Sequence, residues 1–435
     1  MRSKIIASPL CGAMVAFLFV IGTASGGRAA AEAPATEKVL YSFGYIFPDA
    51  DNPEGGLVFD TSGNLYGTTF AGGLSGGYGA VYELSPSGGG WTETILYSFC
   101  PNCAGGSSPL GSLAIDAEGN LYGTAFHGGG NGCGGGCGVV FELSPGAQSW
   151  NETVVYAFSG GSDGAIPFAG LVFDTAGNLY GTTLYGGTGK CPTTGFAPGC
   201  GVVFELSKST TGDWTETVLH SFQGGKDGDS PSARVTLDGA GNVFGTTAGS
   251  APDDPGTVFK LAHEKTGKWN ETVLYRFAGA ADGNSPEADV VLDKEGSVYG
   301  TTRYGGTGKC SVYGYKGCGT VFKVQHSEAT WTESVLHSFG VGESGEDPAA
   351  GLVFNATGDL YGTTAEGGNG CGTVFQLTPT SGGKWSEKVL HRFACSTSDG
   401  AFPLGDLILD SAGNIYSTDQ YGGTYDSGTV FEVTP

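Results

Sequence analysis

The chain is a succession of short apolar runs separated by glycine-rich polar segments. The first complete unit contains GLVFD (residues 56–60), NLYGTT (64–69), AVYELS (80–85) and TETILYSF (92–99). Runs of this length, rich in Val, Leu, Tyr and Phe and bounded by Gly, Asp, Asn and Ser, predict β-strands. We name these four predicted strands A, B, C and D, and we expect an all-β protein.

The same unit recurs along the whole chain. All six tryptophans stand in a W-x-E context, at intervals of 59, 64, 55, 62 and 54 residues. Self-similarity at a period of this size indicates a tandem-repeat architecture rather than two or three separate domains. Counting strand A gives seven units, which span roughly residues 55–99, 111–158, 169–222, 233–277, 288–339, 350–393 and 405–435.

The two ends of the repeat array complement each other. The last unit stops at Pro435 after strand C, whereas TEKVLYSF at residues 36–43 is a strand D without its A, B and C. A strand missing at one end and supplied at the other indicates a closed ring. The pattern predicts a seven-bladed β-propeller of four-stranded antiparallel blades, with the N-terminal strand completing the last blade.

The connections within a unit follow simple turn chemistry. The segment D-x-x-G-N between strands A and B predicts a type I turn, in which Asp60 accepts hydrogen bonds and Gly63 adopts a positive φ. Gly67, at the centre of strand B, predicts a close approach of a neighbouring sheet.

The unit G-L-x-x-D-x-x-G-N-L-Y-G-T-T-x-x-G-G…G-x-V-F-x-L resembles the GloVer tandem repeat of bacterial exported proteins. The resemblance covers essentially all of residues 36–435. It implies export and a propeller-like fold, and it implies no reaction. Some members of that family carry C-terminal anchors, whereas this sequence ends inside a repeat, so we expect release to the periplasm or the medium.

The N-terminus predicts a signal peptide over residues 1–31, followed by a single propeller over residues 32–435. Arg2 and Lys4 precede the apolar stretch AMVAFLFVI, and Ala29-Ala30-Ala31 offers a cleavage site. Cys11 directly follows Leu10, which is not the spacing of a lipoprotein signal. No second apolar run is long enough to span a bilayer, so we expect a secreted or periplasmic monomer without a transmembrane segment.

Charge narrows the class of partner. Removal of residues 1–31 leaves 17 basic and 43 acidic side chains, a net charge of −26. Such a surface repels nucleic acid and anionic membranes, and it favours cations or neutral ligands.

Cysteine usage agrees with export. Ten cysteines remain besides Cys11, an even number that predicts disulfides in an exported chain. Zinc sites are less favoured, because each local pair lies in a different repeat and no histidine clusters with it. The expected pairs are Cys100 with Cys103, Cys133 with Cys137, Cys191 with Cys200, Cys310 with Cys318, and Cys371 with Cys395.

The candidate site lies on the face that carries the D–A and B–C loops, because the B–C loops vary most between units. The D–A loops share a D-G-x-x-P motif whose aspartates could surround the channel mouth, and a ring of carboxylates suits Ca²⁺. The alternative is that these aspartates only cap turns. The five are Asp49, Asp163, Asp227, Asp282 and Asp399; Gly105 and Ser344 replace them in the other two loops.

Catalytic motifs are not convincing. GGTGKC at residues 186–191 and 305–310 lacks the spacing of a phosphate loop, and the G-x-S-x-G matches do not begin helices. The glutamate of each W-x-E, and the strand D position that alternates Tyr and His, recur in too many units to be one active site. We therefore expect an exported binding scaffold for an extracellular glycan or an exported protein. The alternatives are a carbohydrate-active hydrolase or lyase at the axial channel, and a structural envelope component.

Overall fold

The computed structural model describes residues 34–44, 49–74, 76–100, 104–129, 132–191, 197–249, 254–265, 267–312, 314–328, 330–342 and 344–435. The predicted signal peptide lies outside these residues. Residues 35–435 form one compact unit. In the part of the chain that the structure describes there are 33 strands and no helix, and therefore none that could cross a membrane.

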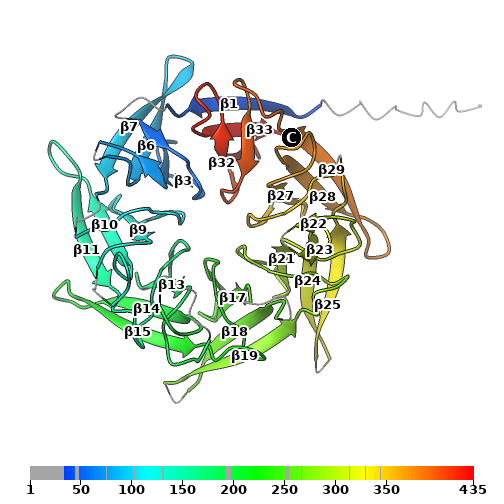
Figure 1. Ribbon diagram of the computed structural model, residues 1–435, viewed down its shortest axis with the longest axis horizontal. Helices are drawn as coiled ribbons and strands as arrows, with labels where there is room; N and C mark the ends of the chain where they lie inside the picture. The colour runs from blue at the N-terminus through cyan, green and yellow to red at the C-terminus, as the bar shows by residue number, and fades with distance from the viewer. Residues whose placement is uncertain are drawn as a thin grey trace, which may run out of the picture. The chain divides into compact units, whose positions relative to one another are not determined.

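The strands form seven antiparallel four-stranded blades arranged in a ring, which confirms the predicted propeller (Figure 1). The A strands are β3 (Val58–Phe59), β8 (Ala114–Ile115), β12 (Val172–Phe173), β16 (Thr236–Leu237), β20 (Val291–Leu292), β26 (Val353–Phe354) and β31 (Ile408–Leu409). The B strands are β4 (Leu65–Thr69), β9 (Leu121–Ala125), β13 (Leu179–Thr183), β17 (Val243–Thr247), β21 (Val298–Thr302), β27 (Leu360–Thr364) and β32 (Ile415–Gly422).

The outer half of each blade is formed by longer strands. The C strands are β6 (Ala80–Ser87), β10 (Val139–Ser144), β14 (Val202–Lys208), β18 (Thr257–His263), β24 (Thr320–Ser327), β28 (Thr373–Pro379) and β33 (Thr429–Thr434). The D strands are β7 (Gly90–Ser98), β11 (Asn151–Ala157), β15 (Trp214–Ser221), β19 (Trp269–Arg276), β25 (Thr330–Ser338), β29 (Trp385–Arg392) and, for blade seven, β1 (Thr36–Ser42).

The ring is closed by the N-terminal strand, as the sequence predicts. Strand β1 pairs antiparallel with β33, from Thr36 opposite Thr434 to Ser42 opposite Thr429. Figure 1 shows the blue N-terminal strand lying beside the red C-terminal strands at the rim. Blade seven therefore combines the two ends of the propeller chain.

The A–B turn has the expected chemistry. In blade one, Oδ1 of Asp60 accepts hydrogen bonds from the backbone N–H groups of Ser62 (2.8 Å) and Asn64 (2.9 Å). Gly63 has a φ of 86°, a conformation that glycine adopts without steric cost. The turn is thus specified by its own residues.

Gly67 is required for a different reason from the close approach of a neighbouring sheet that the sequence predicted. A Cβ at this position would collide with the ring of Tyr82, which lies directly opposite on the paired strand β6. The close approach comes from strand C of the same blade and not from a neighbouring sheet. Gly123 and Gly181 accommodate Phe141 and Phe204 in the same way.

Each C–D pair contains an irregularity that the strand pattern did not predict. In blade seven, Val39 lies opposite Phe431 and Tyr41 lies opposite Val430, so that Leu40 has no partner in the ladder. The same shift occurs in all seven blades. This β-bulge explains why adjacent residues of strand D, such as Leu40 and Tyr41, are both apolar or aromatic.

Successive blades are joined by aromatic rings. The phenylalanine after each strand D packs edge-to-face against the aromatic residue of strand C in the next blade, with ring centroids 5.0–5.2 Å apart. The seven pairs are Phe43–Tyr82, Phe99–Phe141, Phe158–Phe204, Phe222–Phe259, Phe277–Phe322, Phe339–Phe375 and Phe393–Phe431. The phenylalanines after strand D are at most 3% exposed, so these seams form the hydrophobic core.

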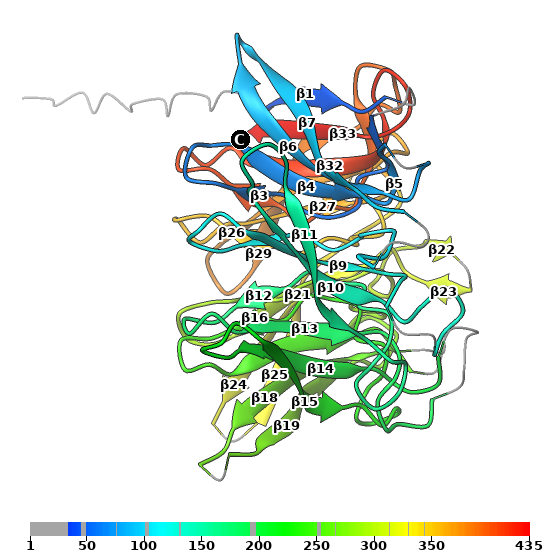
Figure 2. The same cartoon turned by 90° about the vertical axis from the view of Figure 1, so that its left-hand side faces the viewer.

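The two faces of the ring differ in their loops. Short additional strands occur in the B–C and D–A segments: β2 (Ala50–Asp51) pairs with β5 (Ala71–Gly72), β22 (Ser311–Val312) pairs with β23 (Tyr315–Lys316), and β30 (Gly400–Pro403) pairs with β32. Figure 2 shows β5, β22 and β23 on one side of the ring. We call this side the D–A/B–C face.

We expect closure by β1 to dominate the stability of blade seven. Replacement of Phe43 by Ala removes a fully buried ring from the closing seam and should lower the free energy of unfolding by about 3–5 kcal/mol. Deletion of residues 36–43 should lower the melting temperature further. Denaturant and thermal unfolding of the mature chain measure both effects, with Lys38→Ala on the exposed side of the same strand as the control. A truncated chain that melts together with the full-length protein would show that β1 does not close the ring.

Candidate functional site

The five predicted aspartates cap the D–A turns. Asp163 accepts hydrogen bonds from the backbone N–H groups of Ser159 (2.8 Å) and Gly161 (3.2 Å), and from the hydroxyl of Tyr156 (3.3 Å). The other four make equivalent contacts with a backbone N–H four or five residues earlier; they are Asp49, Asp227, Asp282 and Asp399. Their hydrogen bonds are those of turn caps, which is the alternative interpretation of the D-G-x-x-P motif.

Each aspartate also belongs to a polar cluster at the seam between two blades. The hydroxyl of Tyr41 donates to Asp49 (3.4 Å) or to Glu93 (3.3 Å) of the next blade's W-x-E motif. Tyr97 contacts Glu152 in the same way (3.5 Å), although Gly105 replaces the aspartate there. Histidine replaces tyrosine at His220, which lies 3.2 Å from Asp227. The alternating Tyr/His position and the recurrent glutamate are therefore parts of one seam.

The seam glutamates are poorly solvated. Burial raises the pKa of Glu216, Glu271, Glu333 and Glu387 to about 7. In each of these four the Oε1 atom is buried and has no hydrogen-bond partner. A carboxylate in this position is destabilised by desolvation, so the protonated form is favoured up to neutral pH.

The axis is lined by other residues than the five aspartates. A cavity of ≈ 100 Å³ is surrounded by the segments that follow the D–A prolines, and none of its described lining residues belongs to the five. Its polar side chains include Ser112, Arg234, Asp289 and Asp406. Arg234, Asp289 and Asp406 also line a second cavity of ≈ 530 Å³, whose wall includes Phe173, Leu237, Leu292 and Phe354. These three charged residues thus separate the two cavities.

The axial residues form two hydrogen-bonded groups. Asp289 accepts from the backbone N–H of Arg234 (2.8 Å) and from its Nε (2.7 Å). Asp406 accepts from the backbone N–H of Gly351 (3.0 Å) and from the hydroxyl of Ser112 (3.2 Å). Both oxygens of each carboxylate are therefore engaged by other blades.

Charge at the axis is incompletely balanced. Burial and the nearby Asp406 raise the pKa of Asp289 to about 7, although the Arg234 guanidinium opposes the rise. One cation thus faces two carboxyl groups in a partly desolvated space. The axial group can take up a proton near neutral pH.

These axial residues were not predicted from the sequence, although the sequence contains a pattern that could have identified them. The first position of strand A is Gly56, Ser112, Gly170, Arg234, Asp289, Gly351 and Asp406 in blades one to seven. Four of the seven blades thus carry a polar side chain where the other three have glycine. Strict repetition elsewhere hides this variation, because strand A otherwise looks alike in every unit.

Four of the five predicted disulfides are confirmed. They are Cys133–Cys137, Cys191–Cys200, Cys310–Cys318 and Cys371–Cys395, with Cα atoms 5.0–5.5 Å apart. The predicted partner of Cys100 is Cys103, which lies outside the described residues. The four disulfides fit an extracellular or periplasmic protein.

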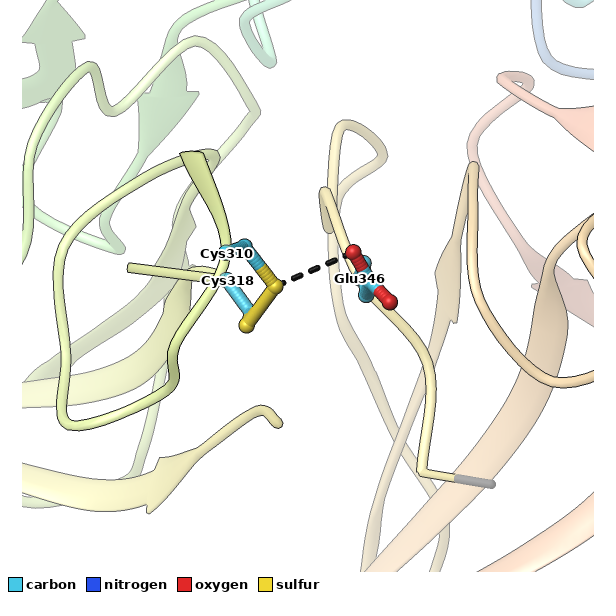
Figure 3. A group of neighbouring side chains, drawn as sticks. All are labelled: Cys310, Cys318 and Glu346. Carbon is cyan, nitrogen blue, oxygen red and sulfur yellow. Dashed lines mark hydrogen bonds between the residues drawn. A yellow bond between two sulfur atoms is a disulfide. The ribbon is translucent and has the colours of Figure 1, made fainter. Parts of the chain in front are cut away.

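An acidic side chain faces one of these disulfides. Figure 3 shows Glu346, from the next D–A loop, pointing toward the Cys310–Cys318 bridge, with Oε2 3.0 Å from Sγ of Cys310. These three residues have metal-like spacing. However, cysteine binds metals as the thiolate, and the two cysteines of a disulfide have no thiolate to offer. The group is therefore not a metal centre.

Exposed apolar side chains concentrate on the B–C loops. Of the seven exposed large hydrophobic residues in the described chain, five lie in the B–C segments of blades one and seven. We call them the seam patch: Phe70 (41% exposed), Leu74 (56%), Tyr78 (38%), Tyr421 (37%) and Tyr425 (52%). Blades one and seven are adjacent because β1 closes the ring between them.

Comparison with known families agrees with the repeat. The sequence profile of the Gloeobacter/Verrucomicrobia repeat matches residues 21–194, 137–317 and 308–435. The chain belongs to the Gloeobacter/Verrucomicrobia repeat family. This confirms the resemblance to the GloVer repeat. A search of curated proteins found no match.

Solved structures show a similar fold for this Gloeobacter/Verrucomicrobia repeat protein. PorZ, an essential surface component of the type-IX secretion system of Porphyromonas gingivalis, aligns with a TM-score of 0.50 and 16% identity. The alignment covers 88% of this chain and 46% of PorZ, so the chain spans about half of that protein. A Lactobacillus plantarum protein aligns with a TM-score of 0.50 and 15% identity, over 88% of this chain and 98% of that one. The family and the fold fit a binding or scaffold role.

The seam glutamates predict a pH dependence of stability. Their pKa is about 7 in the folded protein and 4.5 in the unfolded chain, so between these values the folded state holds protons that the unfolded chain has released. The free energy of unfolding should therefore fall as pH rises from about 4.5 to 7 and level off above 7, by about 1–2 kcal/mol per glutamate because water partly screens each group.

Thermal unfolding at pH 5 and pH 8 tests this dependence. Combined Glu216→Gln, Glu271→Gln, Glu333→Gln and Glu387→Gln substitution should reduce the difference between the two pH values. Glu118→Gln, at an exposed position of an A–B turn, should leave it unchanged. An equal pH dependence in the wild type and the fourfold variant would refute the assignment.

The axial ion pair gives a second stability prediction. Arg234→Met should destabilise the protein by about 3–5 kcal/mol at pH 8, because it leaves the buried Asp289 without its cation. The double variant Arg234→Met/Asp289→Ser should recover most of this loss, since serine occupies the same position in blade two. Urea unfolding measures both. A double variant as unstable as the single one would show that the loss does not come from leaving Asp289 without its cation.

Proposed function

We propose that this repeat protein is an exported scaffold that binds another exported protein through the D–A/B–C face. The observation that carries the proposal is the seam patch, in which five exposed apolar side chains belong to the B–C segments of two adjacent blades. Monomeric soluble proteins rarely expose contiguous apolar patches, and such patches mark interaction sites. Aromatic residues in particular are enriched in protein interfaces.

The patch is built on a connected stretch of backbone. The N–H of Phe70 donates to the carbonyl of Asn52 (2.9 Å), and the N–H of Asn52 donates to the carbonyl of Ser427 (2.9 Å). The ring of Tyr425 lies beside Gly44. The B–C loops of blades one and seven are therefore held together through the D–A loop between them. This arrangement presents apolar side chains from both blades to one partner.

The composition of the patch favours a protein over a glycan. Tyrosine and phenylalanine suit either ligand, but Leu74 is the most exposed of the five, and an exposed aliphatic side chain gains most from burial against another apolar surface. The net negative charge of the chain favours a partner with a neutral or basic rim. The similarity to PorZ supports the fold of such a scaffold and carries no information on its partner.

A second candidate is a carbohydrate-active hydrolase or lyase at the axis. It is favoured by Asp289 and Asp406, two neighbouring carboxyl groups at the end of a ≈ 530 Å³ cavity with an apolar wall. The elevated pKa of Asp289 suits a general acid. Against this candidate, all four carboxyl oxygens accept hydrogen bonds from the protein itself.

Capture experiments test the scaffold. The immobilised mature protein is incubated with the secreted and envelope proteins of its source bacterium, and the bound proteins are identified by mass spectrometry. We expect a defined partner whose recovery falls at least tenfold with Phe70→Ser/Leu74→Ser/Tyr425→Ser, because these changes remove most of the apolar surface. Val335→Ser, an exposed hydrophobic position on the outer strand β25, is the matched control and should bind normally.

Other outcomes separate the alternatives. Binding on a glycan array that the triple variant abolishes would assign the patch to a glycan. Oligosaccharide cleavage that Asp289→Asn abolishes would assign the protein to the enzymes. Equal capture by the triple variant and the Val335→Ser control would remove the seam patch as the binding site.

A further inference from the structure

Among the described seams, only the one between blades six and seven brings a glutamate, a histidine and an aspartate close enough together to hold a metal ion. It combines Glu37 of β1, His391 of β29 and Asp399 of the D–A loop between them, and one ligand atom of each lies within 4.8 Å of the others. Figure 1 shows β1 next to β29 at this seam. The three residues come from the two ends of the propeller chain and meet only because the ring is closed.

The spacing of this set suits a metal ion. Two ligands of a tetrahedral Zn²⁺, each about 2.1 Å from the metal, lie about 3.4 Å apart. Nε2 of His391 lies 3.2 Å from Oδ1 of Asp399, which is close to that separation. Oε1 of Glu37 is buried and has no hydrogen-bond partner, so it is free to complete the set. The side chain of His391 is 20% exposed, which leaves a path for an ion from solvent.

A fourth residue points to a cation independently. Asp419 is fully buried, and its Oδ1 has no hydrogen-bond partner, whereas its Oδ2 accepts from the hydroxyl of Thr429 (2.6 Å). It lies against Gly400, the residue after Asp399, and interacts electrostatically with Asp399 and Glu37. The corresponding residue of the other B strands is Thr69, Ala125, Thr183, Thr247, Thr302 or Thr364. A carboxyl group buried beside two further carboxyl groups must either hold a proton or be balanced by a nearby cation, and a metal ion bound at this set would supply that positive charge.

We propose that Glu37, His391 and Asp399 bind a divalent transition-metal ion of the zinc class, with Asp419 as a buried acidic neighbour. An imidazole nitrogen with carboxylate oxygens is a donor set for Zn²⁺ and related ions, whereas Ca²⁺ takes oxygen ligands alone. The site shares Asp399 with the predicted calcium ring at the channel mouth, but it differs from that ring in its metal and in its other ligands, Glu37 and His391. It is independent of the partner proposed for the seam patch.

Such an ion would fasten the closing strand. Glu37 lies on β1, His391 lies on β29, and Asp399 lies in the D–A loop between them. That loop is fixed by the hydrogen bond from the N–H of Ala394 to Asp399 and by the disulfide of the next residue, Cys395. Metal bound to these three ligands links β1 to blade six across the seam between blades six and seven. Because the ligands come together only in the closed ring, metal binding stabilises closure.

The chain contains a matched seam that serves as the control. His220, Asp227 and Glu271 occupy the equivalent positions between blades three and four, and Nε2 of His220 lies 3.2 Å from Oδ2 of Asp227. There the residue equivalent to Asp419 is Thr247, whose hydroxyl shares a hydrogen bond with Thr257 (2.8 Å). Tyrosine occupies the histidine position at four other seams (Tyr41, Tyr97, Tyr156 and Tyr275), so replacement of histidine by tyrosine is compatible with the fold.

Calorimetric titration of the tag-free, chelator-stripped mature protein with Zn²⁺ tests the proposal. We expect one saturable site, and a melting temperature that rises with Zn²⁺. His391→Tyr and Glu37→Gln should each weaken binding at least tenfold. Asp419→Thr should weaken it about 10–100-fold, as for a residue that supports metal ligands. His220→Tyr should bind like the wild type.

Three outcomes would overturn the proposal. The first is the absence of saturable Zn²⁺ binding to the folded wild-type protein. The second is equal weakening by His391→Tyr and His220→Tyr, or by neither. The third is a site that takes Ca²⁺ with the same affinity in His391→Tyr and in the wild type. The melting curve of each variant without metal shows that it is folded, so that a loss of binding reports on the ligand that was removed.

Discussion

The fold depends on the edge-to-face contact between the phenylalanine that follows each strand D and the aromatic residue of strand C in the next blade. Each such pair contributes about 0.5–1.5 kcal/mol beyond its buried area, so seven pairs contribute about 4–10 kcal/mol. That sum is comparable to the whole net stability of a typical domain, about 5–15 kcal/mol. An isolated blade has no partner for its phenylalanine, and the contact is complete only when Phe43 reaches Tyr82 and closes the ring.

The polar half of each seam depends on the same geometry. The aromatic contact brings the strand D tyrosine or histidine of one blade against the W-x-E glutamate of the next, as for Tyr41 and Glu93. The glutamate is thereby withdrawn from water, and its pKa rises because desolvation penalises the charged form. The pKa of the seam glutamates thus depends on how tightly the blades pack. Protonation of these buried glutamates also avoids adding further negative charge to a strongly acidic protein.

Much of this fold could be predicted from the sequence, because its rules are local. The Asp60 turn, the four strands of each unit and the short loops between three of the cysteine pairs are all visible within a few residues. Other features depend on contacts that no local pattern records. Leu40 bulges from the β1–β33 ladder, Gly67 is required by Tyr82 rather than by another sheet, and Ser112 meets Asp406 across 294 residues of sequence. The D-G-x-x-P aspartates were found by sequence, but only the structure shows that their partners lie at the seams.

The departures from the repeat are concentrated in blade seven. This blade carries Asp406 at the axis, Asp419 in place of threonine, Tyr421 near the end of β32 and Tyr425 in its B–C loop. It is also the blade assembled from both ends of the propeller chain, and hence the one whose integrity depends on the docking of β1. A ligand that binds only the closed form shifts the equilibrium toward closure by mass action. A ligand bound at blade seven therefore also stabilises the docking of β1, on which closure of the ring depends. The same residues in an interior blade would stabilise a seam whose two blades are already joined by the continuous chain.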